Sequence, residues 1–190
     1  RIITKIVQIS RNERTRLMQA LAAIHYDRGY DVDRILNEVS QALCRQGIRV
    51  GGLVQVTGRE PISGCMQSVH LVDLLTQESF SIWEDRGVGV QGCRLSANGL
   101  AEAEAALTAA VEQRVDLLIV NRFGRAESEG HGVRQSIERA VPEGIAVLTA
   151  VRAPYDAAWE EFHGGMATDL PCSNTVVIDW AMAATVKAID

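Results

Sequence analysis

The sequence predicts an α/β fold, a three-layer sandwich whose mostly parallel sheet carries an inserted antiparallel hairpin. Short apolar runs alternate with helix-like segments from residue 21 onward, which is typical of strands joined by right-handed helical crossovers. The most apolar run, "VDLLIVN" at 115–121, is typical of a central parallel strand. Two strand-like pieces at 67–75 and 78–85 meet at a tight turn near 76–77, which predicts the hairpin.

The first half of the chain predicts a strand, a helix and a second strand. "LAAIHY" at 21–26 is a short apolar run expected to form a buried strand. Asp31 can cap the following helix, whose apolar residues recur at helical spacing until Gly47 ends it. "RVGGLVQV" at 49–56 predicts the second strand. Turn residues at 58–65 and a Gly-rich loop at 86–92 flank the hairpin.

The second half predicts further alternation of helices and strands. We expect a helix over 96–114, the central strand, a long polar loop over 122–132 and a helix over 133–144. "IAVLTAV" at 145–151 predicts another buried strand, and a short helix follows over 155–165. Residues 175–189 are compatible with either a strand or a helix.

Composition limits the function classes. Residues 1–16 are polar and basic and predict an N-terminal arm, whereas 17–190 predict a single domain. The net charge of −5 disfavours a nucleic-acid partner, and no apolar run is long enough to span a membrane. The four cysteines lack CxxC spacing, so we expect reduced thiols, no structural zinc and a cytoplasmic protein.

Three loops follow predicted parallel strands and are the expected ligand-binding elements, because such sheets bind ligands beyond the carboxyl ends of their strands. These loops are "YDRGYDVD" at 26–33, "NRFGRAESEGHG" at 121–132 and "VRAPYD" at 151–156.

The motifs "VGGLVQV", "HLVDLL", "LLIVNRFG" and "AVLTAV" occur in an order and spacing that resemble the nucleoside-triphosphatase family of P-loop proteins, over about residues 21–151. "YDRGYDVD", "GCRL" and "NRFGRAESEG" resemble more closely an uncharacterised bacterial family of degenerate P-loop proteins labelled as molybdate-transport ATP-binding-like. The resemblance implies a P-loop-NTPase-like sheet and a link to molybdenum metabolism.

The first loop lacks the groups that a nucleotide site needs. Aligning Gly29 with a Walker A glycine puts Asp31 at the second glycine, Val32 at the lysine and Asp33 at the magnesium-binding hydroxyl. At an effective dielectric constant of about 20, a carboxylate about 4 Å from a phosphate charge costs about 4 kcal/mol, and the helix dipole returns about 0.3–1 kcal/mol. Asn121 and Arg122 stand where a Walker B acid is needed. Both substitutions argue against conventional NTP hydrolysis.

Three interpretations of the acidic loop remain open. Asp31 could cap the helix while Asp27 and Asp33 are solvated or pair with Arg28 and Arg34. Asp27, Asp31 and Asp33 could instead hold a divalent cation, the one cofactor that the sequence indicates, because clustered carboxylates suit hard cations. The loop could also pair with basic groups of a ligand or partner.

Positive charge in two other segments predicts anion binding. Arg122, Arg125, His131 and Arg134 lie near an expected helix start close to Gly130, and Arg94 precedes the helix over 96–114. Solvated charges balanced by Glu127 and Glu129 are the alternative. Cys93 beside Arg94 is either a small packed residue or a thiol activated at the helix start.

The expected function is therefore a noncatalytic P-loop-like domain that binds a small anion, either an oxyanion or a nucleotide, or a partner protein, as an accessory in molybdenum metabolism. An atypical nucleoside-triphosphatase or phosphotransferase and a pure protein-interaction module are the alternatives. The expected ligand-binding residues are Gly29, Asp31, Asp33, Arg94, Asn121, Arg122 and Arg125.

Overall fold

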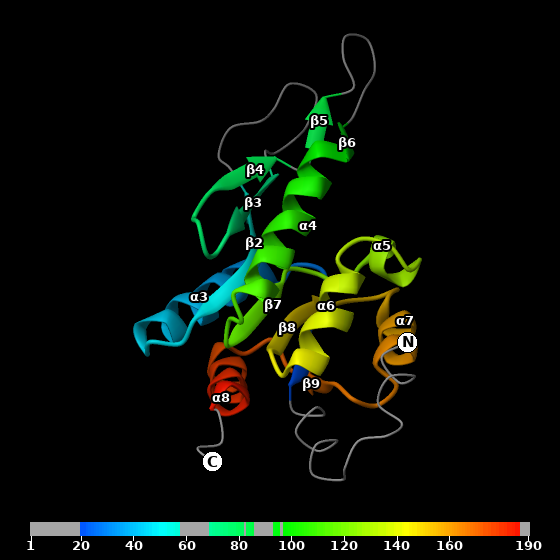
Figure 1. Cartoon of the computed structure of the whole chain (residues 1–190). Helices are drawn as coiled ribbons and strands as arrows, with labels where there is room; N and C mark the ends of the chain where they lie inside the picture. The colour runs from blue at the N-terminus through cyan, green and yellow to red at the C-terminus, as the bar shows by residue number, and fades with distance from the viewer. Residues whose placement is uncertain (1–19, 58–68, 82, 86–92, 96, 187–190) are drawn as a thin grey trace.

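The computed structural model describes residues 20–57, 69–81, 83–85, 93–95 and 97–186. The strands are β1 (Leu21–His25), β2 (Val50–Thr57), β3 (Val69–Asp73), β4 (Ser79–Ser81), β5 (Trp83–Asp85), β6 (Cys93–Leu95), β7 (Leu117–Val120), β8 (Ala146–Val151) and β9 (Thr168–Leu170). Seven of them form one sheet in the order β4-β3-β2-β7-β8-β1-β9, and β5 pairs with β6 separately (Figure 1). The predicted arm at 1–16 and the segments 58–68 and 86–92 lie outside the described residues, so the division at residue 16 stays a prediction.

The five strands β2, β7, β8, β1 and β9 are parallel, which confirms the predicted mostly parallel sheet. The predicted central strand, β7, lies in the middle of the order, and all four of its side chains are fully buried. Burying one Leu or Ile side chain stabilises the fold by about 1.5–3 kcal/mol, so this strand is a main part of the core.

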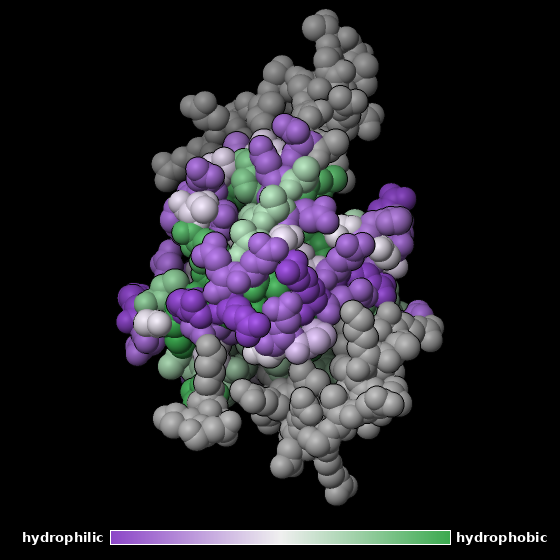
Figure 2. Space-filling view, viewed as in Figure 1, coloured by the Kyte–Doolittle hydropathy of each residue, from purple (hydrophilic) through white to green (hydrophobic). Residues whose placement is uncertain are grey.

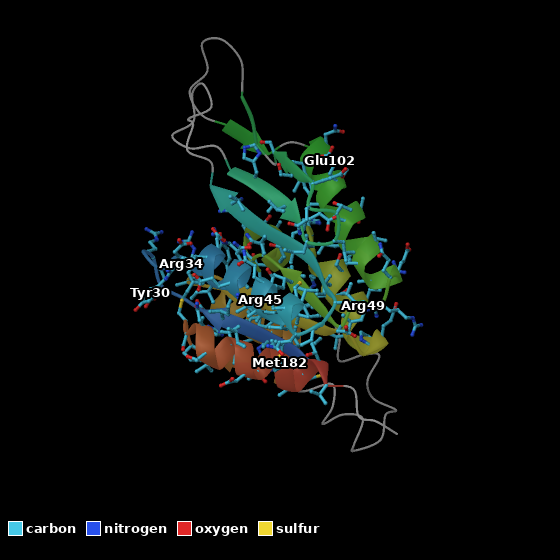
Figure 3. The ribbon with its side chains drawn as sticks, turned by 90° about the vertical axis from the view of Figure 1, so that its left-hand side faces the viewer. Tyr30, Arg34, Arg45, Arg49, Glu102 and Met182 are labelled. Atoms are coloured by element: carbon cyan, nitrogen blue, oxygen red, sulfur yellow. The ribbon has the colours of Figure 1, made fainter. Side chains whose placement is uncertain are left out.

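Helices cover both faces of the sheet, as the three-layer prediction requires. On one face α3 (Val32–Arg45) lies beside α8 (Asn174–Thr185), as Figure 3 shows. On the other lie α4 (Ala97–Glu112), α6 (Arg134–Ala140) and α7 (Asp156–His163). Successive strand residues alternate between the two cores: Ile24 packs with the α3 side, and Ala23 packs with the α4 side.

The predicted hairpin is confirmed. β3 pairs antiparallel with both β2 and β4, and the turn between β3 and β4 holds Gln77 at a φ of 63°. The carboxylate of Asp73 fixes this turn, because Oδ1 accepts a hydrogen bond from Leu75 N at 2.9 Å and Oδ2 accepts one from Thr76 Oγ1 at 3.0 Å.

The glycine pair of "VGG" lets neighbouring elements approach β2 closely. A Cβ on Gly51 would lie 2.8 Å from the Cβ of Ala110 in α4. Gly52 has a φ of 103°, and a Cβ there would lie 2.1 Å from the carbonyl oxygen of Ile119 in β7. Both positions therefore require glycine on steric grounds.

Three features differ from the sequence-based expectation or resolve it. The polar loop at 122–132 contains a short helix, α5 (Arg125–Ser128), and the helix after it ends in a 3-10 turn, η1 (Val141–Glu143). The ambiguous C-terminal segment is helical, because Val177 and Ala181 are one helical turn apart and both are buried. The sequence did not predict β9, a three-residue strand that, among the described strands, pairs with β1 alone and lies at the sheet edge.

The face formed by α4 and α6 is mainly hydrophilic on its outside (Figure 2), as expected for helices whose apolar sides face the sheet. Within the described ranges, no helix is both long and apolar enough to cross a bilayer.

Candidate functional site

Three loops meet beyond the carboxyl edge of the sheet, as the sequence predicted. Tyr26 follows β1, Arg122 follows β7 and Arg152 follows β8, three strands that are neighbours in the sheet. The Cζ atoms of Arg122 and Arg152 each lie 5.9 Å from the centre of the Tyr26 ring, which is within the range of cation–π attraction. The aromatic ring thus connects two guanidinium groups from different loops.

The Tyr26 phenol is partly withdrawn from water. Burial raises its pKa above the usual value, while the positive charges of Arg122 and Arg152 oppose that rise. Tyr26 is therefore a neutral phenol at physiological pH, and the ring contributes an apolar surface rather than a charge.

A pocket of about 640 Å³ opens between the first and third loops. It is lined by Tyr26, Asp27, Arg28, Arg152, Ala153 and Pro154. Neither Arg28 nor Arg152 forms an ion pair with another described residue, although Asp27 places one carboxylate at the same pocket. This volume lies within the range of about 300–1,000 Å³ that small-molecule sites occupy.

Arg122 is engaged by an internal ion pair. Its Nη2 lies 2.6 Å from Asp33 Oδ2, and Gln55 Nε2 donates to the same oxygen at 3.0 Å. The side chains of Asp33 and Arg122 are 18% and 35% exposed. Asn121 Oδ1 accepts a hydrogen bond from Gln55 N at 3.1 Å. These contacts join the end of β2, the end of β7 and the first turn of α3.

The ion pair corrects one expectation for the acidic loop. Asp33 pairs with Arg122 rather than with a nearby arginine of its own helix, and Arg34 pairs with Glu38 instead. Val32, at the position of the Walker lysine, is 1% exposed and packs in the core. The residue that the sequence alignment places at the lysine position is therefore a buried apolar side chain.

The remaining residues of the first loop shape the turn. Asp31 Oδ1 accepts a hydrogen bond from Arg34 N at 3.0 Å, so it caps α3 as predicted. Gly29 has a φ of 101°, which a residue with a side chain rarely adopts. The next residue, Tyr30, is 60% exposed, and Figure 3 shows it with Arg34 at the N-terminal end of α3.

The three aspartates predicted to share a cation are held apart. Asp31 caps the helix, Asp33 meets Arg122, and Asp27 lines the pocket. In the part of the chain that the structure describes, no three His, Cys, Asp or Glu side chains lie close enough together to hold a metal ion.

Arg125 lies on the outside of α5 and not in the cluster. It is 80% exposed, and its Nε pairs with Glu129 Oε1 at 2.9 Å one turn later. Glu127, a solvated balancing charge in the alternative interpretation, is 8% exposed, and its two oxygens accept hydrogen bonds from Gly124 N at 2.9 Å and Val133 N at 3.1 Å. This carboxylate fixes the shape of the second loop.

The expected helix start near Gly130 is also displaced, because α6 begins at Arg134. Arg134 pairs with Glu138 at 3.0 Å and lies over the Phe162 ring at 4.6 Å. Its guanidinium group is therefore engaged by its own helix and by the core beneath that helix.

Arg94 and Cys93 belong to a short strand that ends just before α4 begins, so Arg94 precedes this helix as predicted. They lie in β6, where the backbone of Arg94 pairs with Glu84 of β5. Their side chains lie outside the described part of the structure, so the predicted roles of Arg94 and Cys93 stay predictions.

The arginines that line the pocket, Arg28 and Arg152, were not predicted from the sequence as ligand-binding residues. Arg28 was considered only as a partner for aspartates, and Arg152 was not singled out although its loop was. The available signal was the position of both residues directly after parallel strands, where loops from neighbouring strands converge.

The comparisons with known proteins agree with this fold. The chain is 39% identical over 160 residues to the Molybdenum import ATP-binding protein ModC 2 of Bradyrhizobium diazoefficiens. The match covers 84% of this chain but only 18% of that protein, so the chain spans less than a fifth of the relative's length.

A solved structure, the solution structure of a human cancer-related nucleoside triphosphatase, shares the fold. It superposes with a TM-score of 0.63 over 88% of this chain and 99% of the other, at 13% sequence identity. The predicted likeness to the fold of a nucleoside triphosphatase is confirmed. The model of the family described as "Protein of unknown function (DUF2478)" matches residues 21–180, so the chain belongs to this family.

Proposed function

We propose that this domain binds a small anion, an oxyanion or a nucleotide, in the pocket between the first and third loops and does not carry out conventional NTP hydrolysis. The observation that carries the proposal is that Arg28 and Arg152 line this pocket without an ion-pair partner among the described residues. Guanidinium groups that are not neutralised internally are suited to bind phosphate-like or carboxylate groups with two parallel hydrogen bonds.

The charge balance supports an anionic ligand. Two arginines and one aspartate line the pocket, which leaves one net positive charge. At an effective dielectric constant of about 20, one guanidinium about 4 Å from an anion contributes about 4 kcal/mol before desolvation is subtracted. Arg122 adds less, because Asp33 already balances its charge.

The residues at the two expected Walker positions argue against phosphoryl transfer. A P-loop enzyme needs a lysine for the β- and γ-phosphates and an acid to hold magnesium. Val32 is buried at the first position, and Asn121 and Arg122 occupy the second. The acid that follows, Glu127, binds two backbone N–H groups.

Within this proposal, the predicted ligand residues of the first two loops act mainly by positioning. Gly29 and Asp31 set the turn that carries Arg28, because the turn needs a positive φ and the helix start needs a cap. Asn121 and Asp33 hold Arg122 beside Tyr26.

The name of the bacterial relative supports a cellular context. ModC 2 is named as a molybdenum import ATP-binding protein, and its matched segment is a small part of a longer chain. We propose that this domain is an accessory to molybdenum uptake or use, and that it detects an anion rather than supplying the energy of transport.

Isothermal titration at constant ionic strength tests the proposal with molybdate, tungstate, phosphate and ATP as separate ligands. Arg28→Ala and Arg152→Ala should each weaken binding by about tenfold or more. Arg139→Ala is the matched control, because Arg139 pairs with Glu112 and Glu143 away from the pocket. It should leave the affinity unchanged.

Binding that is lost equally in all three variants, or no binding of any of these anions, would refute the proposal. A phosphate-release assay with ATP and GTP covers the enzymatic alternative. Release that disappears in Asp33→Ala would favour an atypical nucleoside-triphosphatase over the binding domain proposed here. If no anion binds and no phosphate is released, a protein-interaction module is the remaining alternative.

A further inference from the structure

We infer that the pocket takes an organic anion, a flat apolar group bearing a phosphate or similar charge, in preference to a bare tetrahedral oxyanion. This inference rests on the proposed function and specifies its ligand class. It follows from the size of the pocket and from which residues form its walls.

The pocket has room for more than an inorganic oxyanion. A water molecule occupies about 30 Å³, and a tetrahedral oxyanion is only a few times larger. The pocket measures about 640 Å³. An oxyanion at the arginines would leave most of that space to solvent, whereas an organic anion of nucleotide size would fill it and displace the water.

The lining has two chemically distinct parts. Tyr26, Ala153 and Pro154 offer apolar surface, and Arg28 and Arg152 offer positive charge. Ala153 and Pro154 are both exposed, so covering them would remove apolar surface from water and stabilise a complex. A ligand with only charged oxygens would gain nothing from this part of the pocket.

The Tyr26 side chain is partly buried against the core, which restricts the ring before any ligand arrives. Two guanidiniums lie 5.9 Å from the centre of the Tyr26 ring, and one of them is fixed by Asp33. Ordering a mobile side chain on binding costs about 0.5–1.5 kcal/mol. A ring that is already restrained avoids part of this cost, and the part of it that lines the pocket offers apolar contact to an aromatic group.

The test compares inorganic phosphate with phenyl phosphate, which adds one aromatic ring to the same kind of anion. Isothermal titration at constant ionic strength measures both dissociation constants. The wild-type domain should bind phenyl phosphate about tenfold or more tightly than phosphate, because the ring covers the apolar wall. Benzyl alcohol, which has a ring and no charge, should bind far more weakly than either.

Two substitutions of Tyr26 separate the contribution of its aromatic ring to binding from that of apolar packing. Tyr26→Leu keeps a buried apolar side chain but removes the ring, so the ratio of the two dissociation constants should fall to about three or less. Tyr26→Phe keeps the ring and should keep the wild-type ratio. Circular dichroism and thermal unfolding show whether each variant is folded before the titrations are interpreted.

The outcomes distinguish this inference from the proposed function. Equal affinities for phosphate and phenyl phosphate in the wild type would overturn the organic-anion inference and leave anion binding intact. A wild-type ratio that persists in Tyr26→Leu would overturn the role of the aromatic wall. If neither anion binds, the proposed function fails and the inference fails with it.

Discussion

Replacing Asp33 with Asn should destabilise the fold, because it leaves Arg122 without the carboxylate that lies 2.6 Å from its Nη2. Exposed ion pairs contribute about 0–1 kcal/mol, whereas removing one partner of a buried pair costs about 3–5 kcal/mol. With side-chain exposures of 18% and 35%, this pair lies between the two cases. We therefore expect a loss of about 1–3 kcal/mol in the free energy of unfolding.

A double-mutant cycle isolates the pair from its surroundings. Urea unfolding of the wild type, Asp33→Asn, Arg122→Gln and the double variant should give a coupling energy of about 1–2 kcal/mol. The pair of Arg125 and Glu129, which are 80% and 54% exposed, is the matched control and should couple by less than about 0.5 kcal/mol. Equal coupling in the two pairs would refute the argument that partial burial strengthens the bond between Asp33 and Arg122.

Three further substitutions have defined expectations. Gly52→Ala should destabilise the sheet by about 3 kcal/mol or more in urea unfolding, because the new Cβ would meet the backbone of Ile119 at 2.1 Å. Glu127→Ala should cost about 2–4 kcal/mol by the same assay, because two partly buried backbone N–H groups lose a charged acceptor. Burial lowers the pKa of His163 below its usual value, so the native state favours the neutral ring. The contribution of His163 to the free energy of unfolding should be fully present above about pH 6.5. It should be lost as the pH falls below that value. His163→Asn, whose Oδ1 can replace Nδ1 as acceptor, should flatten this dependence when unfolding is measured between about pH 5 and 7.5. An unchanged pH profile in that variant would assign the dependence to other groups.

The order of the elements could be predicted from the sequence because burial leaves a readable pattern. The run at 115–121 is apolar because β7 is covered on both faces, and Asp31 precedes an apolar run because α3 needs a cap. The strand β9 could not be predicted, because three residues at a sheet edge that pair with one neighbour leave no periodic signal.

The site was only partly predictable, because its contacts join residues that are distant in sequence. The spacing of the first loop predicts Asp33 beside a phosphate. Its observed partner, Arg122, is 89 residues away in the sequence. Arg125 belongs to the same segment as Arg122, yet its side chain pairs with Glu129 on the outer surface of α5. The three converging loops were predictable from topology, whereas the direction of each arginine depends on its packing.

The position of the positive charge explains why the proposed ligand site differs from that of a P-loop enzyme. At the start of α3, the lysine position is a core residue, Val32, and the charge that reaches this point from β7 is cancelled by Asp33. A triphosphate placed there would have to break the ion pair and would then meet an unpaired carboxylate, which costs about 4 kcal/mol at 4 Å and an effective dielectric constant of about 20. Among the described residues, Arg28 and Arg152, on the side of β1 and β8, carry positive charge that no ion pair balances. An anion would therefore gain most in the proposed pocket, at the beginning of the first loop and beside the third, rather than at the start of α3.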